Sequence, residues 1–295
     1  MPDLITPLTA FPRLGLHTLA NLLAGRLVRP GEIAQSYDRV SAGYRSTYLK
    51  KMHKYNDQLL ELLCRRLDSS APRILDLAGG DGYNCERLRR RIPGAELTLL
   101  DLSPGMLDRC RLPGVQRICS GMTDYLGRCA PGQYDAILCT WALMYEQPRQ
   151  VLAGCARALR PGGLLGILVN DRRTLPQVRR AFPGLLAEYA HEVDRLMLDL
   201  PTPRSAGQLC RWGKAAGLRP LCAREKVQNF RFATHGQAAR FVTSTGALAG
   251  YDQMLDLRRP DIQASLAERL ARQGEPCITH HFVLALFETR EEPIP

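Results

Sequence analysis

The sequence predicts an α/β fold with a parallel β-sheet, and two features of its central part indicate this. Between residues 73 and 170, short apolar runs that read as strands alternate with segments of helical periodicity. The first strand, RILDLA, leads into the glycine-rich turn GGDG at 79–82 and then into a helical pattern. Alternating strands and helices require crossover connections, which are right-handed and make consecutive strands parallel.

The N-terminal part is predicted to be helical. In 13–28 leucines recur at close to helical spacing, and Gly25 and Pro30 end the pattern. A second helical region covers 33–67, with apolar positions from Tyr37 to Leu63. We expect residues 1–68 to form a helical extension that also serves as a lid.

The central part then supplies five strands. They are RILDLA, LTLLDL, VQRICS, YDAILCT and LLGILV, and the helical patterns between them are ERLRRRI, GMLDRCRL and 148–159.

The C-terminal half continues the same α/β domain, which we expect to span 69–295. Ser205 and Gly217 are typical of the first and last positions of a helix at 204–217. The remaining segments are a helical insertion near 172–200, a strand at 219–232, a second helical insertion near 235–272 and a last strand at 277–289. Insertions after late strands stand over the ligand crevice of such a sheet, and their apolar residues favour a lid.

Composition indicates an ordinary globular protein of the cytoplasm. Hydrophobic residues make up 45% of the 295, and no apolar run approaches the roughly 20 residues of a membrane span. The N-terminus MPDLITPL carries an acid and prolines, unlike an export signal. The ten cysteines form no Cys-x-x-Cys pair, and we interpret Cys64, Cys119, Cys139 and Cys155 as small buried hydrophobes in a reducing compartment.

The net charge of +11 raises the question of nucleic acid. Only five of the 40 basic residues are lysines, and the arginines are scattered, with the densest run at Arg89, Arg90 and Arg91. A basic bias spread through the whole chain forms no binding patch. Nucleic acid is therefore a disfavoured partner.

The turn after the first strand is predicted to bind a nucleoside-containing cofactor. Glycine is needed where backbone approaches a ligand closely or adopts positive φ. A dinucleotide-binding loop that began at Gly80 and Gly82 would require a third glycine where Cys85 stands, which disfavours a nicotinamide cofactor. Asp101 ends the second strand, 19 residues beyond Gly82, where a carboxylate accepts ribose hydroxyls or caps the next helix, a task that Ser103 is also able to perform.

At these residues the sequence resembles the class I S-adenosylmethionine-dependent methyltransferases. ILDLAGGDG and LLDLSPGML are similar to their cofactor-binding half, most of all to the ubiquinone/menaquinone-biosynthesis type with its DLAGGTG loop. YDAILCTWALMYEQPRQVLAGCARALRPGGLLGIL at 134–168 resembles their fourth strand and the RPGG turn, and YDRVSAGY resembles their entry segment. The resemblance implies a Rossmann-like sheet of seven mostly parallel strands with an antiparallel last strand.

The resemblance also implies which residues hold S-adenosylmethionine. Ala78, Gly80 and Gly82 would receive its methionine end, Asp76 would orient the loop and the ammonium group, and Asp101 would bind the ribose. A second group would complete the site, with Met106 on the adenine, Met122 offering its backbone N–H, and Thr140, Trp141 and Tyr44 near the methionine end and the methyl group. One position departs from the family pattern: Gly121 stands where many relatives carry an acid, and Asp124 is the available substitute.

Methyl transfer is an in-line displacement that requires no metal, and we expect none. A base is needed only for a nucleophile that arrives protonated. The candidate bases are His53, His235 and Tyr145, followed by His280, His281, Tyr44 and Asp171. His280 and His281 lie on opposite faces of one predicted strand, so at most one of them faces inward.

Three functions follow from these observations. The leading one is methyl transfer to a small organic acceptor through an oxygen, carbon, nitrogen or sulfur nucleophile. The alternatives are an RNA or DNA methyltransferase and a non-catalytic protein that binds the cofactor for regulation. The identity of the acceptor and the formation of a homodimer are left open by the sequence.

Overall fold

The computed structural model describes residues 10–40 and 48–290, which separate into two compact units. The sheet unit comprises residues 49–174, 200–227 and the chain from 281, and the helical unit comprises residues up to 48, 175–199 and 228–280. Two long strands run through both units. The predicted 1–68 extension is divided between the units, because the third helix belongs almost entirely to the sheet unit.

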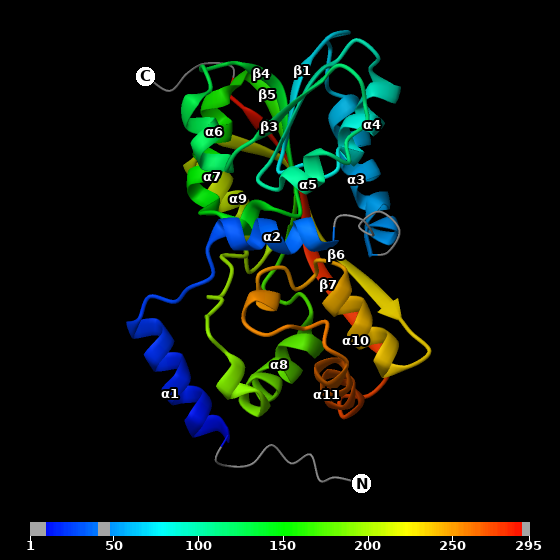
Figure 1. Ribbon diagram of the computed structural model, residues 1–295. Helices are drawn as coiled ribbons and strands as arrows, with labels where there is room; N and C mark the ends of the chain where they lie inside the picture. Colours follow the sequence, from blue (N-terminus) through cyan, green and yellow to red (C-terminus); the bar gives the residue numbers. More distant parts are fainter. Residues whose placement is uncertain (1–9, 41–47, 291–295) are drawn as a thin grey trace. The chain divides into compact units, whose positions relative to one another are not determined.

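The sheet has seven strands in the order β3-β2-β1-β4-β5-β7-β6 (Figure 1). Neighbouring pairs from β3 to β5 are parallel, whereas β7 is antiparallel to β5. The predicted sheet with its antiparallel last strand is thus confirmed. The strands are β1 Arg73–Leu77, β2 Glu96–Asp101, β3 Val115–Cys119, β4 Tyr134–Thr140, β5 Leu159–Asn170, β6 Leu218–Arg231 and β7 Cys277–Thr289.

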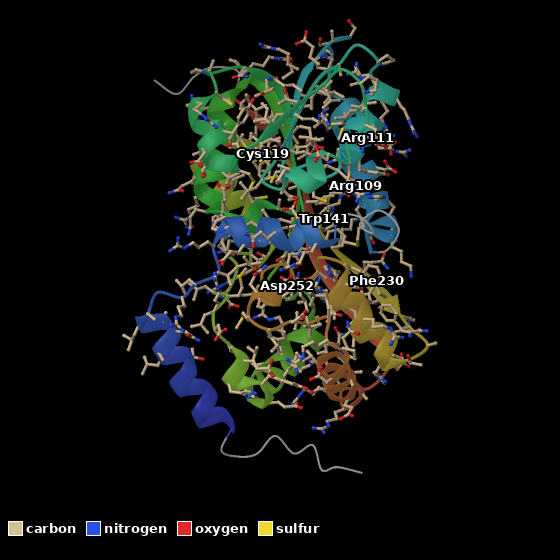
Figure 2. The ribbon with its side chains drawn as sticks, in the orientation of Figure 1. Arg109, Arg111, Cys119, Trp141, Phe230 and Asp252 are labelled. Carbon is tan, nitrogen blue, oxygen red and sulfur yellow. The ribbon has the colours of Figure 1, made fainter. Side chains whose placement is uncertain are left out.

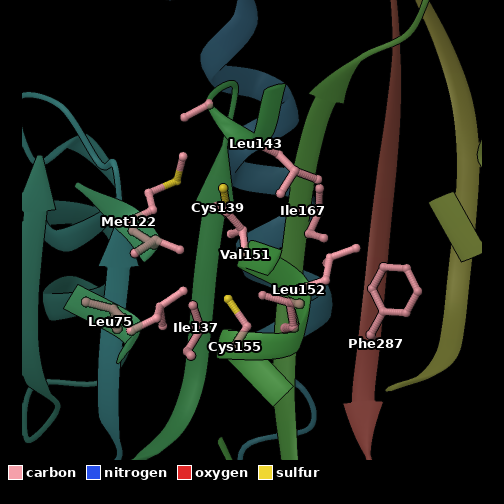
Figure 3. Close-up of a cluster of buried hydrophobic side chains, with 14 of the residues drawn as sticks. Leu75, Met122, Ile137, Cys139, Leu143, Val151, Leu152, Cys155, Ile167 and Phe287 are labelled. Carbon is pink, nitrogen blue, oxygen red and sulfur yellow. The ribbon is translucent and has the colours of Figure 1, made fainter. Parts of the chain in front are cut away.

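Helices cover both faces of this sheet. On one face α3 packs against β5, since a Cβ on Gly166 would meet the Leu59 side chain. On the other face α6, α7 and α9 bury the cluster of Figure 3. The helices of the sheet unit are α3 Tyr48–Cys64, α4 Tyr83–Arg91, α5 Pro104–Leu107, α6 Met122–Arg128, the 3₁₀ turn η2 Leu143–Tyr145, α7 Pro148–Ala158 and α9 Ala206–Ala215.

The cluster in Figure 3 forms the core between the sheet and α7. Leu75, Ile137 and Ile167 project from adjacent strands, and Val151 and Leu152 of α7 pack against them, all at most 1% exposed. Burial of such side chains stabilises the fold by about 1.5–3 kcal/mol each. This core holds the strand ends that carry the site.

The helical unit contains both predicted insertions. Its helices are α1 Ala10–Leu23, α2 Pro30–Val40, α8 Pro176–Glu188, the 3₁₀ turns η3 Ala190–Glu192 and η4 Tyr251–Gln253, α10 His235–Ser244 and α11 Pro260–Ala271. α8 and α10 both pack against α11, and α1 packs against α8. The predicted helical region at 33–67 contains α2 and α3. Within residues 10–40 and 48–290, no helix combines the length and the apolar character needed to cross a bilayer.

The cysteine interpretation is only partly right. All ten thiols are free, and Cys139 and Cys155 are buried as expected. Cys119 is exposed, however, because β3 is the edge strand of the sheet and one of its faces is open. Cys64 is half-buried.

Candidate functional site

The carboxyl ends of β2, β1 and β4 meet at one edge of the sheet. Leu77 of β1 lies in register with Leu100 of β2 on one side and with Cys139 of β4 on the other. The residues that follow, Ala78, Asp101 and Thr140, are therefore neighbours although they come from three separate segments. The strand order changes direction at β1, and α/β sheets bind their ligands at such a point.

The glycine loop at 78–82 turns back over the tip of β1. Ala78, Gly80 and Gly82 adopt positive φ of 54°, 59° and 81°. The Gly79 N–H donates to the Leu100 carbonyl at 3.0 Å, and a Cβ on Gly79 would lie 2.4 Å from the Asp76 carboxyl carbon. The loop is thus held tightly against β1 and β2, which leaves its backbone free of side chains for a ligand.

Asp101 lies beside this loop. Its carboxylate accepts the Gly80 N–H at 2.8 Å and the Ser103 N–H at 2.9 Å. The helix cap is Ser103, whose hydroxyl accepts the Met106 N–H at 3.1 Å. Ser103, and not Asp101, therefore caps α5. The half-exposed Asp101 carboxylate instead joins the loop to the tip of β2.

Beneath the loop lies a buried polar network formed by Asp76, Asn84, Thr140, Asn56 and Trp141. Asn84 Nδ2 donates to Asp76 Oδ1 at 3.0 Å and to Thr140 Oγ1 at 3.1 Å. Asn56 Nδ2 donates to Asn84 Oδ1 at 2.9 Å, and Trp141 Nε1 donates to Asn56 Oδ1 at 2.9 Å. The network connects α3, α4, β1 and β4.

Asp76 is 1% exposed, and no lysine or arginine of the described chain forms an ion pair with it. Burial raises the pKa of Asp76 from 3.8 to about 7; the nearby charges of Asp101 and Asp81 add to the rise, and the hydrogen bond from Asn84 opposes it. A buried carboxylate without a cation favours a positively charged ligand. The site therefore fits S-adenosylmethionine, which carries an ammonium and a sulfonium group.

Trp141, labelled in Figure 2, is the aromatic member of this network, and we call its indole the Trp141 wall. Its backbone φ is 65°, unusual for a bulky residue, and its N–H donates to the Leu168 carbonyl at 2.6 Å. Its ring meets Phe282 edge-on at 5.0 Å between centroids, and Phe282 meets Tyr55 at 4.7 Å. Hydrogen bonding and packing thus hold a partly exposed indole at the end of β4.

Met122 is the first residue of helix α6, directly after the third strand and Gly121. Glu146 accepts the Met122 N–H at 2.6 Å and the Thr123 N–H at 2.8 Å, and so caps this helix. The Met122 N–H expected for adenine is therefore occupied in this structure. A Cβ on Gly121 would lie 3.2 Å from Glu146 Oε1 and 3.6 Å from Asp124 Oδ2, so two carboxylates stand beside the position where relatives carry an acid.

Met106, expected on the adenine, is 1% exposed. Leu102, directly after Asp101, is half-exposed and has apolar surface available for a ligand. Asp81 accepts the Tyr83 N–H at 3.3 Å and so supports the start of α4. Tyr44 lies outside the described residues.

The three leading base candidates have different surroundings. His53 of α3 stacks on Tyr83, directly after the glycine loop, with 3.6 Å between ring centroids and 8° between planes. Tyr145 is partly buried and packs against the core cluster under α7. His235 belongs to the helical unit, where its Nε2 meets the Gly274 carbonyl at 2.8 Å. Only His53 is placed beside the loop.

The secondary candidates are buried to different degrees. His280 is 1% exposed and His281 half-buried, so one of the pair faces inward as predicted. Asp171 is buried and pairs with Arg173 Nη2 at 2.6 Å. Within the described ranges, no group of three or more His, Cys, Asp or Glu side chains is arranged to hold a metal ion.

Sequence reasoning missed Asn56, Asn84 and Glu146. Asn84 is the second residue of α4, and a polar residue on the inward face of a short helix was the one available signal. Asn56 bonds to Trp141, which lies 85 positions later in the chain. Glu146 bonds to Met122 and Thr123, which lie 24 and 23 positions earlier. No local sequence pattern reveals such distant contacts.

Comparison with known proteins agrees with this geometry. Residues 74–163 match the family model described as a methyltransferase domain. A ubiquinone biosynthesis O-methyltransferase of Xylella fastidiosa is 30% identical over 241 residues, which cover 71% of this chain and 92% of that protein. A malonyl-acyl-carrier-protein O-methyltransferase of Laribacter hongkongensis is 33% identical over 171 residues, or 52% of this chain and 55% of that protein.

Among solved structures, the 4+2 cyclase SpnF has a TM-score of 0.57 at 16% identity, with 90% of this chain and 98% of that chain covered. At this identity the likeness concerns the fold. The sequence relative from Xylella, matched over nearly its whole length, shows the family. The chain therefore belongs to the class I S-adenosylmethionine-dependent methyltransferases, of the ubiquinone/menaquinone-biosynthesis type, and transfers a methyl group to a small organic acceptor.

Proposed function

We propose that this enzyme methylates a hydroxyl group of an aromatic, phenol-like acceptor. The observation that carries the proposal is the partly exposed Trp141 wall, held by Asn56 and Phe282 at the end of β4. An aromatic side chain fixed in this way offers a flat face against which a planar ring stacks at offset or edge-on geometry. The O-methyltransferase name of the Xylella relative supports an oxygen nucleophile.

We propose that the cofactor is bound by residues of the sheet unit alone. The backbone of Ala78, Gly80 and Gly82 receives the methionine part, and Asp101 accepts the ribose hydroxyls. Asp76, through its buried charge, favours the cationic end. When bound, S-adenosylmethionine supplies an activated methyl group, so the protein contributes position and exclusion of water.

The adenine contacts follow from exposure. Leu102 rather than the buried Met106 packs against the ring, since it has the available surface. Glu146 or Asp124, both near Gly121, accepts from the adenine amine, and the Met122 N–H becomes available only where Glu146 shifts from the start of α6.

His53 is the proposed base. A phenol has a pKa of about 10, so most of it arrives protonated at neutral pH, and a positioned base accelerates its reaction about 10²–10⁴-fold. His53 stacks on Tyr83 one helical turn from Asn56, and it is partly exposed. Tyr145 and His235 are not required, because packing and the Gly274 carbonyl account for them.

A labelled-methyl assay tests the acceptor class. The purified chain is incubated with methyl-labelled cofactor and, separately, a catechol, a malonyl thioester, a primary amine, a thiol and bulk RNA. We expect label in an alkali-stable aryl ether on the catechol. Transfer only to the thioester carboxylate, the amine, the thiol or RNA would contradict a phenolic acceptor.

The same assay tests His53. His53→Gln should lower kcat by about 10²–10⁴ and remove the acidic limb of the kcat–pH profile, with little change in cofactor affinity. His191→Gln is the matched control, since the His191 side chain is 75% exposed on η3. An unaltered pH profile in His53→Gln would show that the base is another group.

Three further expectations complete the proposal. Ten free thiols support a cytoplasmic location, where the compartment keeps cysteines reduced. The lid role expected for the two helical insertions, near 172–200 and 235–272, stays a proposal. A homodimer stays a prediction.

A further inference from the structure

Helix α1 of the helical unit carries three strongly exposed leucines. Leu19, Leu22 and Leu23 are 52%, 51% and 80% exposed. At 100° per residue they fall within an arc of about 100° and form one continuous strip. We name Leu19, Leu22 and Leu23 the leucine face. The sequence of α1, AFPRLGLHTLANLL, contains no acidic residue.

The helix is anchored elsewhere, so the exposure of this face is not a sign of a detached segment. Asn21 is 5% exposed, and its side-chain amide donates to the Val193 carbonyl at 2.7 Å. The segment after α1 pairs with residue 196: the Val28 N–H donates to the Leu196 carbonyl at 3.0 Å, and the Leu196 N–H donates to the Arg26 carbonyl at 2.9 Å. A fourth leucine, Leu198, is 57% exposed just beyond this pairing.

A charged cavity begins two residues after the leucine face. Its volume is about 870 Å³, and its lining includes three arginines, Arg26, Arg29 and Arg195, and two acids, Glu32 and Asp194. We name the three arginines the arginine cluster. All three side chains are exposed, and Arg195 pairs with Glu32. Within residues 10–40 and 48–290, no side-chain ion pair engages Arg26 or Arg29.

We propose that the leucine face and the arginine cluster dock the enzyme on a bilayer that contains anionic phospholipid. Leucines on one side of a helix insert at the boundary between headgroups and acyl chains, and adjacent arginines bind the lipid phosphates. The chain as a whole, with a net charge of +11, is attracted to such a surface.

A second copy of the chain is a less suitable occupant. A two-fold interface places the same patch of both copies together, and so brings Arg26 and Arg29 of one copy near those of the other. The cavity lining holds three arginines against two acids, Glu32 and Asp194. Arg195 and the Arg29 backbone N–H already engage Glu32. Each facing patch therefore keeps a net positive charge, and this arrangement is repulsive. An anionic bilayer complements both the leucines and the arginines.

Vesicle flotation tests the proposal with the full chain. Vesicles of phosphatidylcholine alone are compared with vesicles in which roughly a third of the lipid is phosphatidylglycerol, at low and high salt. We expect flotation only with the anionic vesicles, weakened by salt. The variant Leu19→Ser/Leu22→Ser/Leu23→Ser should lose about tenfold or more in affinity. Arg26→Ala/Arg29→Ala should lose about fivefold per arginine.

The control Arg240→Ala/Arg258→Ala removes the same charge from exposed positions of the same unit and should bind almost as the parent does. Three results would overturn the proposal. They are equal binding by the leucine variant and the parent, competition by soluble glycerol phosphate that accounts for all binding, and a change of oligomeric mass in the leucine variant without a change in flotation. If the triple variant misfolds by circular dichroism, Leu23→Ser, at the most exposed position, replaces it.

Discussion

Replacing Asp76 by asparagine should remove the pH dependence of stability that this buried carboxyl imposes on the protein. Burial raises the pKa of Asp76 to about 7 from 3.8. A carboxyl whose pKa rises on folding destabilises the folded state once the pH exceeds 3.8, and the full cost is reached above about 7. At 1.36 kcal/mol per pH unit, the cost amounts to about 4 kcal/mol.

The asparagine variant keeps the main contact, because its amide oxygen still accepts from Asn84 Nδ2. Without ligand, the free energy of unfolding of Asp76→Asn relative to the parent should therefore grow by about 4 kcal/mol between pH 4 and pH 8. Cofactor binding should change in the opposite direction. The parent gains affinity as Asp76 ionises, by up to about tenfold per pH unit below pH 7, whereas the variant does not.

Urea unfolding and calorimetric titration over this pH range measure both effects. Asp135→Asn is the control. Burial acts to raise the pKa of Asp135, but the Arg73 backbone N–H and the Arg160 guanidinium lower it overall. Ionised Asp135 therefore stabilises the folded protein above the ordinary pKa of an aspartate, and this stabilisation is lost as the pH falls. The effect is opposite in sign to that of Asp76. If Asp76→Asn and the parent show parallel stability–pH curves, Asp76 is not an uncompensated buried carboxyl.

Three further substitutions test separate parts of the site. Asp101→Ala should weaken cofactor binding by about 1.5–3 kcal/mol per lost charged hydrogen bond, measured by calorimetry; unchanged binding would remove Asp101 from the site. Gly79→Ala places a Cβ 2.4 Å from the nearest side-chain carbon and should destabilise the protein by about 1–3 kcal/mol in urea unfolding, and a stable variant would show that the loop is not tightly packed. Trp141→Phe leaves the buried Asn56 Oδ1 without its donor and should cost about 1–3 kcal/mol, whereas Trp212→Phe should cost less; equal losses would assign the effect to ring size alone.

The sequence was sufficient to predict the sheet and the loop because both depend on local chemistry. Buried strands appear as apolar runs, and the positive φ at Gly80 and Gly82 favours glycine. The position of Asp101 followed from the register of parallel strands, which brings the ends of neighbouring strands together. These features are encoded within a few residues of where they act.

The remaining features depend on which side chains meet across the fold. The sequence predicted that the Met122 N–H binds adenine. In the structure this N–H donates to Glu146, which lies 24 residues later. Asn56 contributes from a helix that precedes the whole sheet, through a bond to an indole 85 positions away. Cys119 is exposed because β3 is an edge strand, and strand order is not visible in the composition of a strand.

The hydrogen bonds from Trp141 through the two asparagines to Asp76 have a consequence for how the enzyme tolerates change. Each of these side chains satisfies the polar atom of the next, in surroundings where an orphaned donor or acceptor costs about 1–3 kcal/mol. A single replacement leaves the neighbouring side chain without its hydrogen-bond partner, whereas a matched pair of replacements restores the hydrogen bond. Substitutions at these positions should therefore accumulate together, so that the indole proposed to bind the acceptor and the buried carboxylate proposed to favour the cofactor are inherited as one unit.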